Sequence, residues 1–477
     1  MESVLLSETV LNYCRRYAKV HDVFDQNIAL HVTQLDKKET MPIKVLWFTN
    51  ILMPDACKCV GRPEPKGSGY WMSVLLDRLK KRSDLKLAVV ASAGRRDCQF
   101  QVDGVKYFVV KTPVSRGIWN RLGSYRDSLP IRSQVRKYAS IVNDWNPDVV
   151  HVHGTEYEFG LTKAWGYTDK PVAVSIQGLM TPCAAKTYGD LLPDQLHGVV
   201  RSMIGLRARS FQSWKGFRKR IPYEEAIIRS CEMVLGRTEW DHAWACAYRP
   251  DVCYRHVDEL MRPEFSEAPN WALEKCNRHQ IFCTSGSQPL KGLHVLVDAV
   301  YRLRDVFPDV RLKVASSGFV PHPQDDYARF VLRQIGEKGL GQTVTFLGHL
   351  DAYEMVNQVQ MANCYVMPSF IENSCNALQE AMLIGAPCVA ANAGGTPSIV
   401  EAGESGLMFP AGDAALLAWQ IGRIFRDDSL ASRLGSNARC TAIERHDPAR
   451  VEAELLNAYK ELSRMRTAVA PKLGRYA

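Results

Sequence analysis

Short apolar strands alternate with amphipathic helices along most of this chain of 477 residues. Apolar runs of strand length are separated by longer stretches whose apolar side chains recur at helical spacing. Because parallel strands need a crossover connection, this alternation predicts parallel sheets covered by helices on both faces. The expected strands are residues 43–49, 85–91, 105–110, 149–153 and 172–176 in the first half, and 280–284, 310–315, 344–347, 364–367, 388–391 and 406–409 in the second.

The chain is longer than one hydrophobic core usually supports, so we expect two main domains. Periodicity is lost between Arg262 and Pro269, which is where an interdomain linker is expected. The sequence predicts an extension of unclear role at residues 1–40, followed by two Rossmann-like domains at 41–262 and 263–450. A C-terminal helix is expected at 451–477, and one option is that this helix crosses back to the first domain.

Composition narrows the class of protein. With 46% hydrophobic and 23% charged residues, the composition is typical of a soluble globular protein. A net charge of +9 fits an anionic small ligand or an anionic membrane surface better than a nucleic acid, so no nucleic-acid partner is expected. The 14 cysteines are scattered and suggest reduced core residues. Without a transmembrane-length run or a signal-peptide layout, the expected location is the cytoplasm.

The segment from Val366 to Gly395 predicts an anion-binding corner. A buried strand ends at Pro368, a loop carries Glu372, and a helix is expected from about Ser374 to Leu383, with Ser374 as its cap. Free amide groups and the positive end of the helix dipole would then point at a ligand.

Two carboxylates, Glu372 and Glu380, frame this corner. Because acids repel phosphate, we expect them to accept hydrogen bonds from hydroxyl groups such as those of sugars. Upstream, Lys291 follows the glycine loop at Gly286 and precedes a helix, where a cation and free amides are able to hold a diphosphate. The loop lacks the Gly-Lys-Ser/Thr of a Walker motif, which disfavours a P-loop ATPase. The pattern predicts a ligand with phosphate in the middle and sugars at both ends.

In the first half, His153, Glu156 and Gln177 follow predicted strands. Ligands of parallel sheets bind at the carboxyl ends of strands, so these side chains are placed where a substrate would lie. An equally weighted alternative is that His153 only satisfies a loop carbonyl. The glycine loop with Gly67 and Gly69 precedes a helix and would let backbone approach a ligand, although such a turn is more often only a connection.

The segment Arg207–Arg220 mixes six cations with three bulky aromatic residues and contains no acid. Cations on anionic lipid head groups with aromatics at the interface would explain this mixture. Phosphate on an acceptor is a second interpretation, and stacking with single-stranded nucleic acid is a third. A helix whose aromatics simply pack inward remains equally open. A membrane contact would place the protein peripherally at the inner face of the plasma membrane.

Glu372 and Glu380, with seven residues between them, resemble the E-x7-E motif of retaining glycosyltransferases of family 4, which have the GT-B fold. The neighbourhood is similar too, with Pro368-Ser369 before the first acid and Gly394-Gly395 beyond the helix. Further matches are Lys291-Gly292, Phe346-Leu-Gly348, the Gly67–Gly69 loop, and Asp148-Val-Val-His151-Val-His153. The resemblance extends from about Met41 to the C-terminus.

The resemblance implies an α/β GT-B fold whose two parallel sheets face each other across a cleft. A nucleotide-diphosphate sugar would bind the domain at 263–450, and a saccharide or lipid-linked acceptor the domain at 41–262. It also implies site residues. The catalytic group would be Glu372, Lys291 and His153. The donor site would be Glu380, Gly286, Asn373, Ser374, Cys375 and Gly348, and the acceptor side Gly67, Gly69 and Gln177. No metal and no cofactor besides the donor substrate is expected.

The sequence also departs from the family pattern. Gly286 stands where the family often has an arginine, and Gln177-Gly178 replaces a frequent His-Gly pair. The best-supported function is transfer of a sugar to an acceptor. The family resemblance implies that this transfer takes place in the synthesis of a bacterial surface polysaccharide. Two alternatives remain open: a sugar-nucleotide 2-epimerase-like enzyme, which needs no acceptor, and a non-catalytic scaffold that binds sugar nucleotides or membranes.

Overall fold

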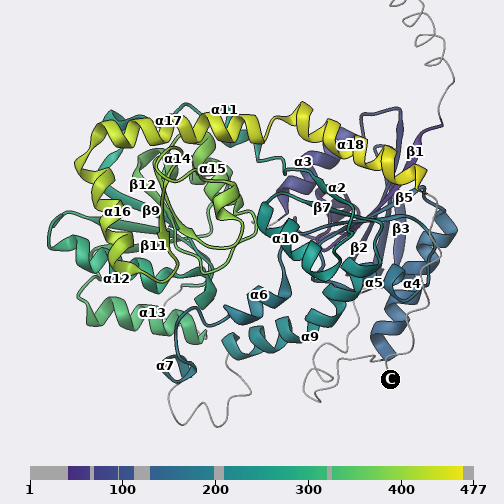
Figure 1. Ribbon diagram of the computed structural model, residues 1–477, viewed down its shortest axis with the longest axis horizontal. Helices are drawn as coiled ribbons and strands as arrows, with labels where there is room; N and C mark the ends of the chain where they lie inside the picture. Colours follow the sequence, from purple (N-terminus) through teal and green to yellow (C-terminus); the bar gives the residue numbers. More distant parts are fainter. Residues whose placement is uncertain are drawn as a thin grey trace, which may run out of the picture. The chain divides into compact units, whose positions relative to one another are not determined.

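The computed structural model, drawn in Figure 1, describes residues 41–64, 69–94, 96–111, 129–197, 209–319 and 325–465. The predicted extension at residues 1–40 and the predicted acceptor-side Gly67 lie outside these ranges. Within the described residues the chain forms two α/β halves, the first built on an eight-stranded sheet and the second on a six-stranded sheet.

The sheet of the first half has the strand order β3-β4-β2-β1-β5-β6-β7-β8. All neighbouring strands are parallel except β3, which pairs antiparallel with β4. Because β1 lies between β2 and β5, the strand order reverses beside β1, and such a reversal is where sheets of this kind bind ligands. The strands are β1 (Ile43–Thr49), β2 (Leu85–Gly94), β3 (Cys98–Val102), β4 (Val105–Lys111), β5 (Val149–His153), β6 (Val172–Ser175), β7 (Met233–Gly236) and β8 (Tyr254–His256).

The sheet of the second half is parallel throughout, in the order β11-β10-β9-β12-β13-β14. Its order reverses between β9 and β12, so the loops after these two strands meet at one edge. The strands are β9 (Asn277–Thr284), β10 (Arg311–Ala315), β11 (Val344–Gly348), β12 (Ala362–Met367), β13 (Cys388–Asn392) and β14 (Leu407–Pro410). The predicted α/β class with two parallel sheets is confirmed, and the antiparallel strand β3 is an addition to it.

Helices connect the strands and cover the sheets (Figure 1). In the first half these are α2 (Pro54–Cys59), α3 (Tyr70–Leu79), α4 (Leu129–Trp145), η2 (Glu158–Gly160), α5 (Leu161–Ala164), α6 (Met180–Ala185), α7 (Pro193–His197), α9 (Arg209–Ser230) and α10 (Glu239–Tyr248). Between and around the strands of the second half lie α11 (Pro263–Glu267), η3 (Leu273–Lys275), η4 (Pro289–Lys291), α12 (Leu293–Arg304), α13 (Asp326–Glu337), α14 (Ala352–Met361), α15 (Asn376–Ile384) and η5 (Thr396–Ser398). The chain ends with α16 (Ala414–Arg426), α17 (Asp428–Arg445) and α18 (Pro448–Arg464).

Strand burial explains why the apolar runs were recognisable. Every residue of β5 and of β12 is buried, because helices cover both faces of a parallel sheet. The first half has one apolar cluster on each face of its sheet, while the second half has one large cluster. Leu196 of α7 belongs to the cluster of the second half, so the chain around α7 packs away from its own sheet.

The helix α18 packs against the first half. Its apolar side chains, among them Val451, Leu455 and Tyr459, belong to the same cluster as Val45 and Trp47 of β1. The structure therefore shows that this helix returns to the sheet that contains β1 (Figure 1). The exact domain boundaries inferred from the sequence stay predictions.

Tyr459 anchors α18 through a buried hydrogen-bond chain. Its hydroxyl oxygen accepts from Trp47 Nε1 at 2.8 Å and lies 2.7 Å from His151 Nδ1. The second ring nitrogen of His151, Nε2, lies 2.7 Å from Ser175 Oγ. Burial lowers the pKa of His151 to about 3, so its ring is neutral and its Nδ1 is able to accept the Tyr459 proton.

We expect Tyr459→Phe to lower the free energy of unfolding by about 1–3 kcal/mol, because it leaves a buried indole N–H and a buried imidazole nitrogen without a partner. Chemical denaturation of the variant and the wild type measures this loss. The control is Tyr301→Phe on α12, where the ring is 39% exposed. Equal stability of both variants would contradict the anchoring role.

Candidate active site

The corner after β12 is built by close backbone contacts between three loops. Phe370 N–H donates to the Leu290 carbonyl at 2.8 Å, and Gly395 N–H donates to the Glu372 carbonyl at 2.9 Å. Gly394 has a φ of +56°, and a Cβ atom there would lie 2.0 Å from the Glu372 carbonyl oxygen. Glycine is therefore required, and the loop that carries Glu372 is held from both sides.

Lys291 and Glu372 form the centre of the corner. Lys291 Nζ donates to Glu372 Oε1 at 2.7 Å, and Ser369 Oγ donates to the same oxygen at 2.7 Å. The lysine side chain is 33% exposed and the glutamate 14%. Burial alone would lower the pKa of Lys291, but the adjacent Glu372 carboxylate raises it above its ordinary value, so the ammonium stays charged.

The second acid is already engaged by an arginine that the sequence reasoning missed. Arg262 donates from Nε and Nη2 to the two oxygens of Glu380 at 2.6 and 2.7 Å. The Glu380 side chain is only 6% exposed, and burial raises its pKa while the Arg262 charge opposes the rise. The guanidinium also lies over the rings of Tyr70, at 5.7 Å, and Phe265, at 4.6 Å. Ligand hydroxyl groups would have to replace this arginine to reach Glu380.

The start of α15 differs from the prediction. The helix begins at Asn376, its N-cap is Cys375, and no side chain caps it. Ser374 was expected to cap this helix, and that expectation is wrong, because its hydroxyl accepts from Gln379 Nε2 at 3.0 Å. The corner keeps the amides of the first helical turn directed toward the loop, as at other helix N-termini.

Asn373, predicted at the donor site, joins the two halves. Its Nδ2 donates to the Ile176 carbonyl at 3.1 Å, and its Oδ1 accepts from Thr238 Oγ1 at 3.0 Å. Both side-chain groups thus have partners in the first half, so only its backbone is left for a ligand. Of the other predicted donor residues, Cys375 is half-buried, and Gly286 has room for a Cβ, whose nearest neighbour would be Lys291 Cγ at 3.9 Å. Gly348 ends β11 with a φ of +75°.

His153, predicted as catalytic, is buried beneath aromatic rings. Its ring centroid lies 3.8 Å from that of His151, 4.5 Å from Trp47 and 5.4 Å from Trp71. Among the described residues neither ring nitrogen has a hydrogen-bond partner, so the alternative of a satisfied loop carbonyl is not seen there. Burial lowers its pKa well below the ordinary value, which leaves a neutral imidazole. Its catalytic role stays a prediction.

The other acceptor-side predictions are placed at loop ends. Gly69 is the N-cap of α3 with a φ of +76°, and a Cβ there would lie 2.2 Å from Ile51 Cδ1. Gln177 is half-buried in the loop after β6, and its Nε2 lies 4.0 Å from Met72 Sδ. The nearby Glu156, a residue that the sequence only placed near a substrate, has a more unusual environment that is described below.

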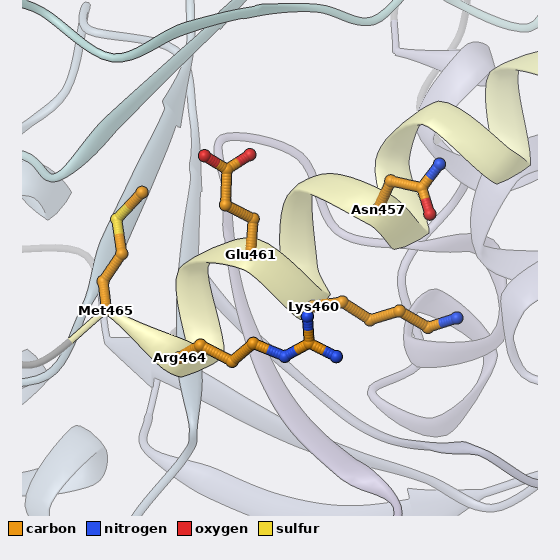
Figure 2. A pocket seen from close by; sticks show the side chains of 5 residues that line it. All are labelled: Asn457, Lys460, Glu461, Arg464 and Met465. Carbon is orange, nitrogen blue, oxygen red and sulfur yellow. The ribbon is translucent and has the colours of Figure 1, made fainter. Parts of the chain in front are cut away.

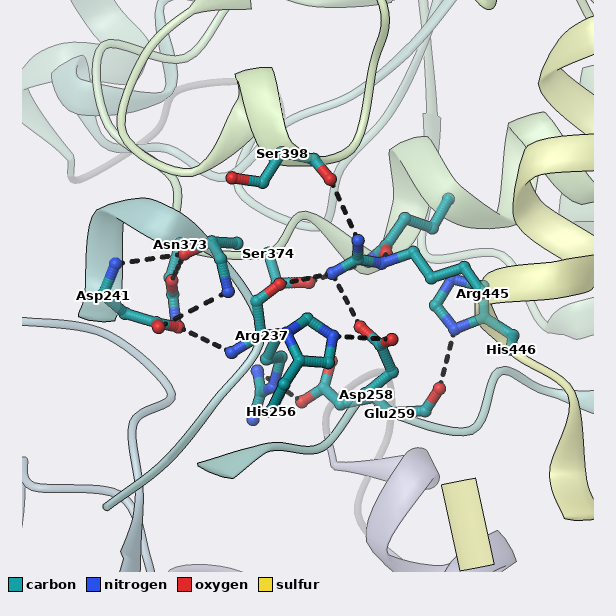
Figure 3. A network of polar contacts seen from close by, with 12 residues as sticks. Arg237, Asp241, His256, Asp258, Glu259, Asn373, Ser374, Ser398, Arg445 and His446 are labelled. Carbon is teal, nitrogen blue, oxygen red and sulfur yellow. Dashed lines mark hydrogen bonds and ion pairs between the residues drawn. The ribbon is translucent and has the colours of Figure 1, made fainter. Parts of the chain in front are cut away.

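A buried network of charges holds the linker between the halves (Figure 3). Arg237 pairs with Glu259 at 2.7 Å, and both side chains are almost fully buried. Asp258 forms an ion pair with Arg445 at 2.6 Å, accepts from Arg450 Nη2 at 3.0 Å, and lies 2.9 Å from His256 Nε2. The sequence predicted a linker at residues 262–269, shortly after Asp258 and Glu259, but not this network, because partners far apart in sequence cannot be paired from their spacing.

Two hollows in the structure are lined by neither Lys291 nor Glu372. A surface pocket of about 420 Å³ is lined by Asn457, Lys460, Glu461, Arg464 and Met465 at the end of α18, and none of the predicted site residues lines it (Figure 2). A narrow crevice with no room for a water-sized molecule adjoins the Lys291 loop, with Gln288, Pro289 and Leu290 in its wall. Within the described ranges, no cluster of three or more His, Cys, Asp or Glu side chains is arranged to hold a metal ion.

Comparison with known proteins agrees with this fold. The structure is similar to sucrose-phosphate synthase of Thermosynechococcus elongatus, with a TM-score of 0.66, 16% identity and coverage of 88% of this chain and 99% of that one. It is also similar to Anabaena HepE in complex with UDP-glucose, with a TM-score of 0.60, 16% identity and coverage of 88% and 100%. Together with the two parallel-sheet halves, these likenesses identify a GT-B fold, as the sequence predicted.

Residues 271–441 match the family model of glycosyl transferases, group 1, and this segment carries Lys291, Glu372 and Glu380. The chain is 29% identical over 210 residues to phosphatidyl-myo-inositol mannosyltransferase of Mycobacterium leprae, across 44% of this chain and 52% of the relative. It is 32% identical over 154 residues to D-inositol 3-phosphate glycosyltransferase of Corynebacterium efficiens, across 32% and 35%. These matches span between a third and about half of the relatives' length.

Proposed function

We propose that this protein is a retaining glycosyltransferase of the family 4 type, which moves a sugar from a nucleotide-diphosphate sugar to a saccharide or lipid-linked acceptor. The observation that carries the proposal is the Lys291–Glu372 pair, 2.7 Å apart, at the N-terminus of α15 within the segment that matches glycosyl transferases. A cation, a carboxylate and free helix amides at the reversal point of a parallel sheet suit a sugar diphosphate.

In this proposal each group has a separate task. Lys291 and the amides at the start of α15 stabilise negative charge on the departing diphosphate. Glu372 holds hydroxyl groups of the transferred sugar near the reacting carbon. Glu380 binds the ribose hydroxyls once Arg262 has released it, so donor binding exchanges one set of hydrogen bonds for another.

The crevice beside the Lys291 loop has no room even for a water-sized molecule, whereas ordinary ligand pockets enclose roughly 300–1,000 Å³. In this proposal the two halves move apart to admit a nucleotide sugar and close again, and closure would exclude water from the reaction. The Asn373 hydrogen bonds to Ile176 and Thr238 are among the contacts that such an opening would break.

The membrane contact stays a separate proposal. Within the described part of Arg207–Arg220, Phe211 and Trp214 stack at 5.7 Å and Arg218 lies over the Trp214 ring at 5.1 Å. These aromatic rings are half-buried, which supports inward packing at least as well as lipid contact. No helix in the part of the chain that the structure covers is long and apolar enough to span a membrane. Sedimentation with anionic and with neutral liposomes distinguishes lipid contact from inward packing of the aromatic rings.

We expect UDP-glucose, which is bound in the HepE complex, or another nucleotide sugar to stabilise the protein. Ligand at a hundredfold excess over its Kd adds about 2.7 kcal/mol to the free energy of unfolding. Thermal-shift measurements with a panel of nucleotide sugars detect this stabilisation. With the donor that stabilises the protein most, nucleotide release is then measured in the presence and absence of acceptor sugars.

Release that depends on an acceptor, with the anomeric configuration retained by NMR, supports the transferase. Nucleotide release that needs no acceptor, with an epimerised sugar as product, supports the 2-epimerase alternative instead. Donor binding without turnover over any acceptor supports a scaffold. A protein that binds none of the nucleotide sugars contradicts the proposed function altogether.

A further inference from the structure

Glu156 lies at the carboxyl edge of the first sheet, where the strand order reverses beside β1. It follows β5 in the loop that begins at Gly154, which has a φ of +97°. A Cβ atom on Gly154 would lie 2.0 Å from Glu156 Oε2, and one on Gly178 would lie 3.9 Å from Oε1. The carboxyl group is therefore held between the loops that follow β5 and β6, which are adjacent strands.

One carboxyl oxygen of Glu156 is buried without a partner. Its Oε2 has no hydrogen bond within the described structure. The neighbouring Glu224 differs, because it accepts from Thr155 Oγ1 at 3.0 Å, from Met180 N–H at 2.8 Å and from Tyr248 Oη at 3.1 Å. A buried acceptor left unsatisfied costs free energy, so such a group in a folded protein calls for an explanation.

The electrostatic surroundings favour an uncharged partner. Burial and the Glu224 carboxylate raise the pKa of Glu156 to about 7, while a hydrogen bond from the Glu156 backbone and the charges of Arg220 and Arg237 oppose the rise. Near neutral pH the group exchanges between a carboxylate and a neutral acid. A hydroxyl group can donate to the first and accept from the second, whereas a fully ionised phosphate has no proton to donate to the carboxylate.

Glu156 is also close to the proposed donor corner. The Ile176 carbonyl, two residues before Gly178, accepts from Asn373, the residue after Glu372. The Cys183 thiol of α6 lies within electrostatic reach of both places, because burial and the charges of Glu372, Glu224 and Glu156 raise its pKa while Lys291 lowers it. The unpartnered oxygen thus lies on the first-half side of the place where a sugar would be transferred.

We propose that Glu156 binds a hydroxyl group of the acceptor, and that the acceptor presents an uncharged polyol or sugar ring at this place rather than a phosphate. The inference rests on the proposed glycosyltransferase function and adds the chemical class of the acceptor to it. Any phosphate that an acceptor carries binds elsewhere.

The test compares Glu156→Ala and Glu156→Gln with the matched control Glu225→Gln, an exposed carboxylate on α9 that pairs with Arg229. Glucose, mannose and myo-inositol, each with and without a phosphate, serve as acceptors with the best donor of the thermal-shift panel. We expect the wild type to use the neutral compounds. Glu156→Ala should raise the acceptor KM at least tenfold while donor hydrolysis without acceptor stays within twofold.

Glu156→Gln should keep part of the acceptor affinity, because an amide also bonds hydroxyls, and should lose the dependence of KM on pH between 6 and 8. A stability measurement needs no acceptor. Because the folded-state pKa of about 7 exceeds the ordinary 4.5, the folded protein binds the proton more tightly, and the wild-type Tm should fall as pH rises from 5 to 8. Glu156→Gln should remove the part of this Tm decrease that titration of Glu156 causes, whereas Glu225→Gln should leave the Tm decrease unchanged.

Normal use of neutral acceptors by Glu156→Ala would overturn the inference, and so would hydrolysis of the donor by the wild type with no neutral acceptor used. An unchanged fall of Tm in Glu156→Gln would do the same. A wild type that neither binds nor hydrolyses a nucleotide sugar contradicts the proposed function itself, which is a different result from all of these.

Discussion

Replacing Glu372 with glutamine is expected to reduce sugar transfer by about 10²-fold, because Glu372 positions the transferred sugar and a small misplacement at a reacting centre has an effect of this size. Glu372 is the only one of the two motif acids that faces Lys291, at 2.7 Å, because Glu380 is paired with Arg262. Glutamine keeps the shape and the hydrogen bond from Ser369 but removes the negative charge. Initial rates of nucleotide release with donor and acceptor measure the loss.

The fold should survive this change, because glutamine keeps the size of the side chain and the hydrogen bond from Ser369, and the Lys291 side chain is 33% exposed to solvent. The matched control is Glu401→Gln, an exposed acid of the same half that follows η5. The control variant should retain wild-type turnover and Tm. Wild-type rates for Glu372→Gln, with donor binding unchanged, would remove this residue from the proposed mechanism.

Much of the fold could be predicted because buried parallel strands are continuous apolar runs bounded by turn residues. The strand β3 was missed, although the sequence carries a local signal for it. Asp103 and Gly104 both have positive φ, of 48° and 80°, between two alternating segments, which is the turn chemistry of a tight hairpin. The signal was available, but the alternation of strands and helices elsewhere favoured an all-parallel sheet.

The candidate site was predictable only where it is local in sequence. Glu372 and the strand before it could be placed from spacing, and Lys291 from its glycine loop. The pairing of Arg262 with Glu380, 118 positions apart, depends on tertiary packing and has no local signal. The same holds for Asn373, whose partners Ile176 and Thr238 belong to the other half. The expected cap at Ser374 failed because Gln379, further along the helix, binds the hydroxyl instead.

The largest effect on stability is expected at Arg445, which joins α17 to the linker between the halves (Figure 3). Its guanidinium donates to Gln379 Oε1 at 3.1 Å, to the Ser398 carbonyl at 2.9 Å and to the Arg237 carbonyl at 2.6 Å. It also pairs at 2.6 Å with Asp258, whose side chain is 2% exposed. Removing one partner of a buried ion pair costs about 3–5 kcal/mol, since the remaining charge cannot be solvated.

We expect Arg445→Met to lower the free energy of unfolding near the lower end of that range, because Asp258 keeps Arg450 and His256 as partners. Urea denaturation at pH 7 measures the loss. The control is Arg433→Met on the same helix, whose partner Glu404 is exposed at 3.3 Å, where about 0–1 kcal/mol is expected. Equal losses for the two variants would show that the buried network does not hold the linker.

The pH dependence of the same pair of variants separates lost charge pairing from lost packing. Burial alone would raise the pKa of Asp258, but the hydrogen bond from His256 and the charge of Arg445 lower it below its ordinary 3.8. A carboxyl group with a lowered folded-state pKa stabilises the protein above that ordinary value and loses this contribution as the pH falls through the folded-state pKa. The difference between wild type and Arg445→Met should therefore shrink below about pH 4. A difference that stays constant down to pH 3 would mean that Arg445 acts through packing of its side chain alone.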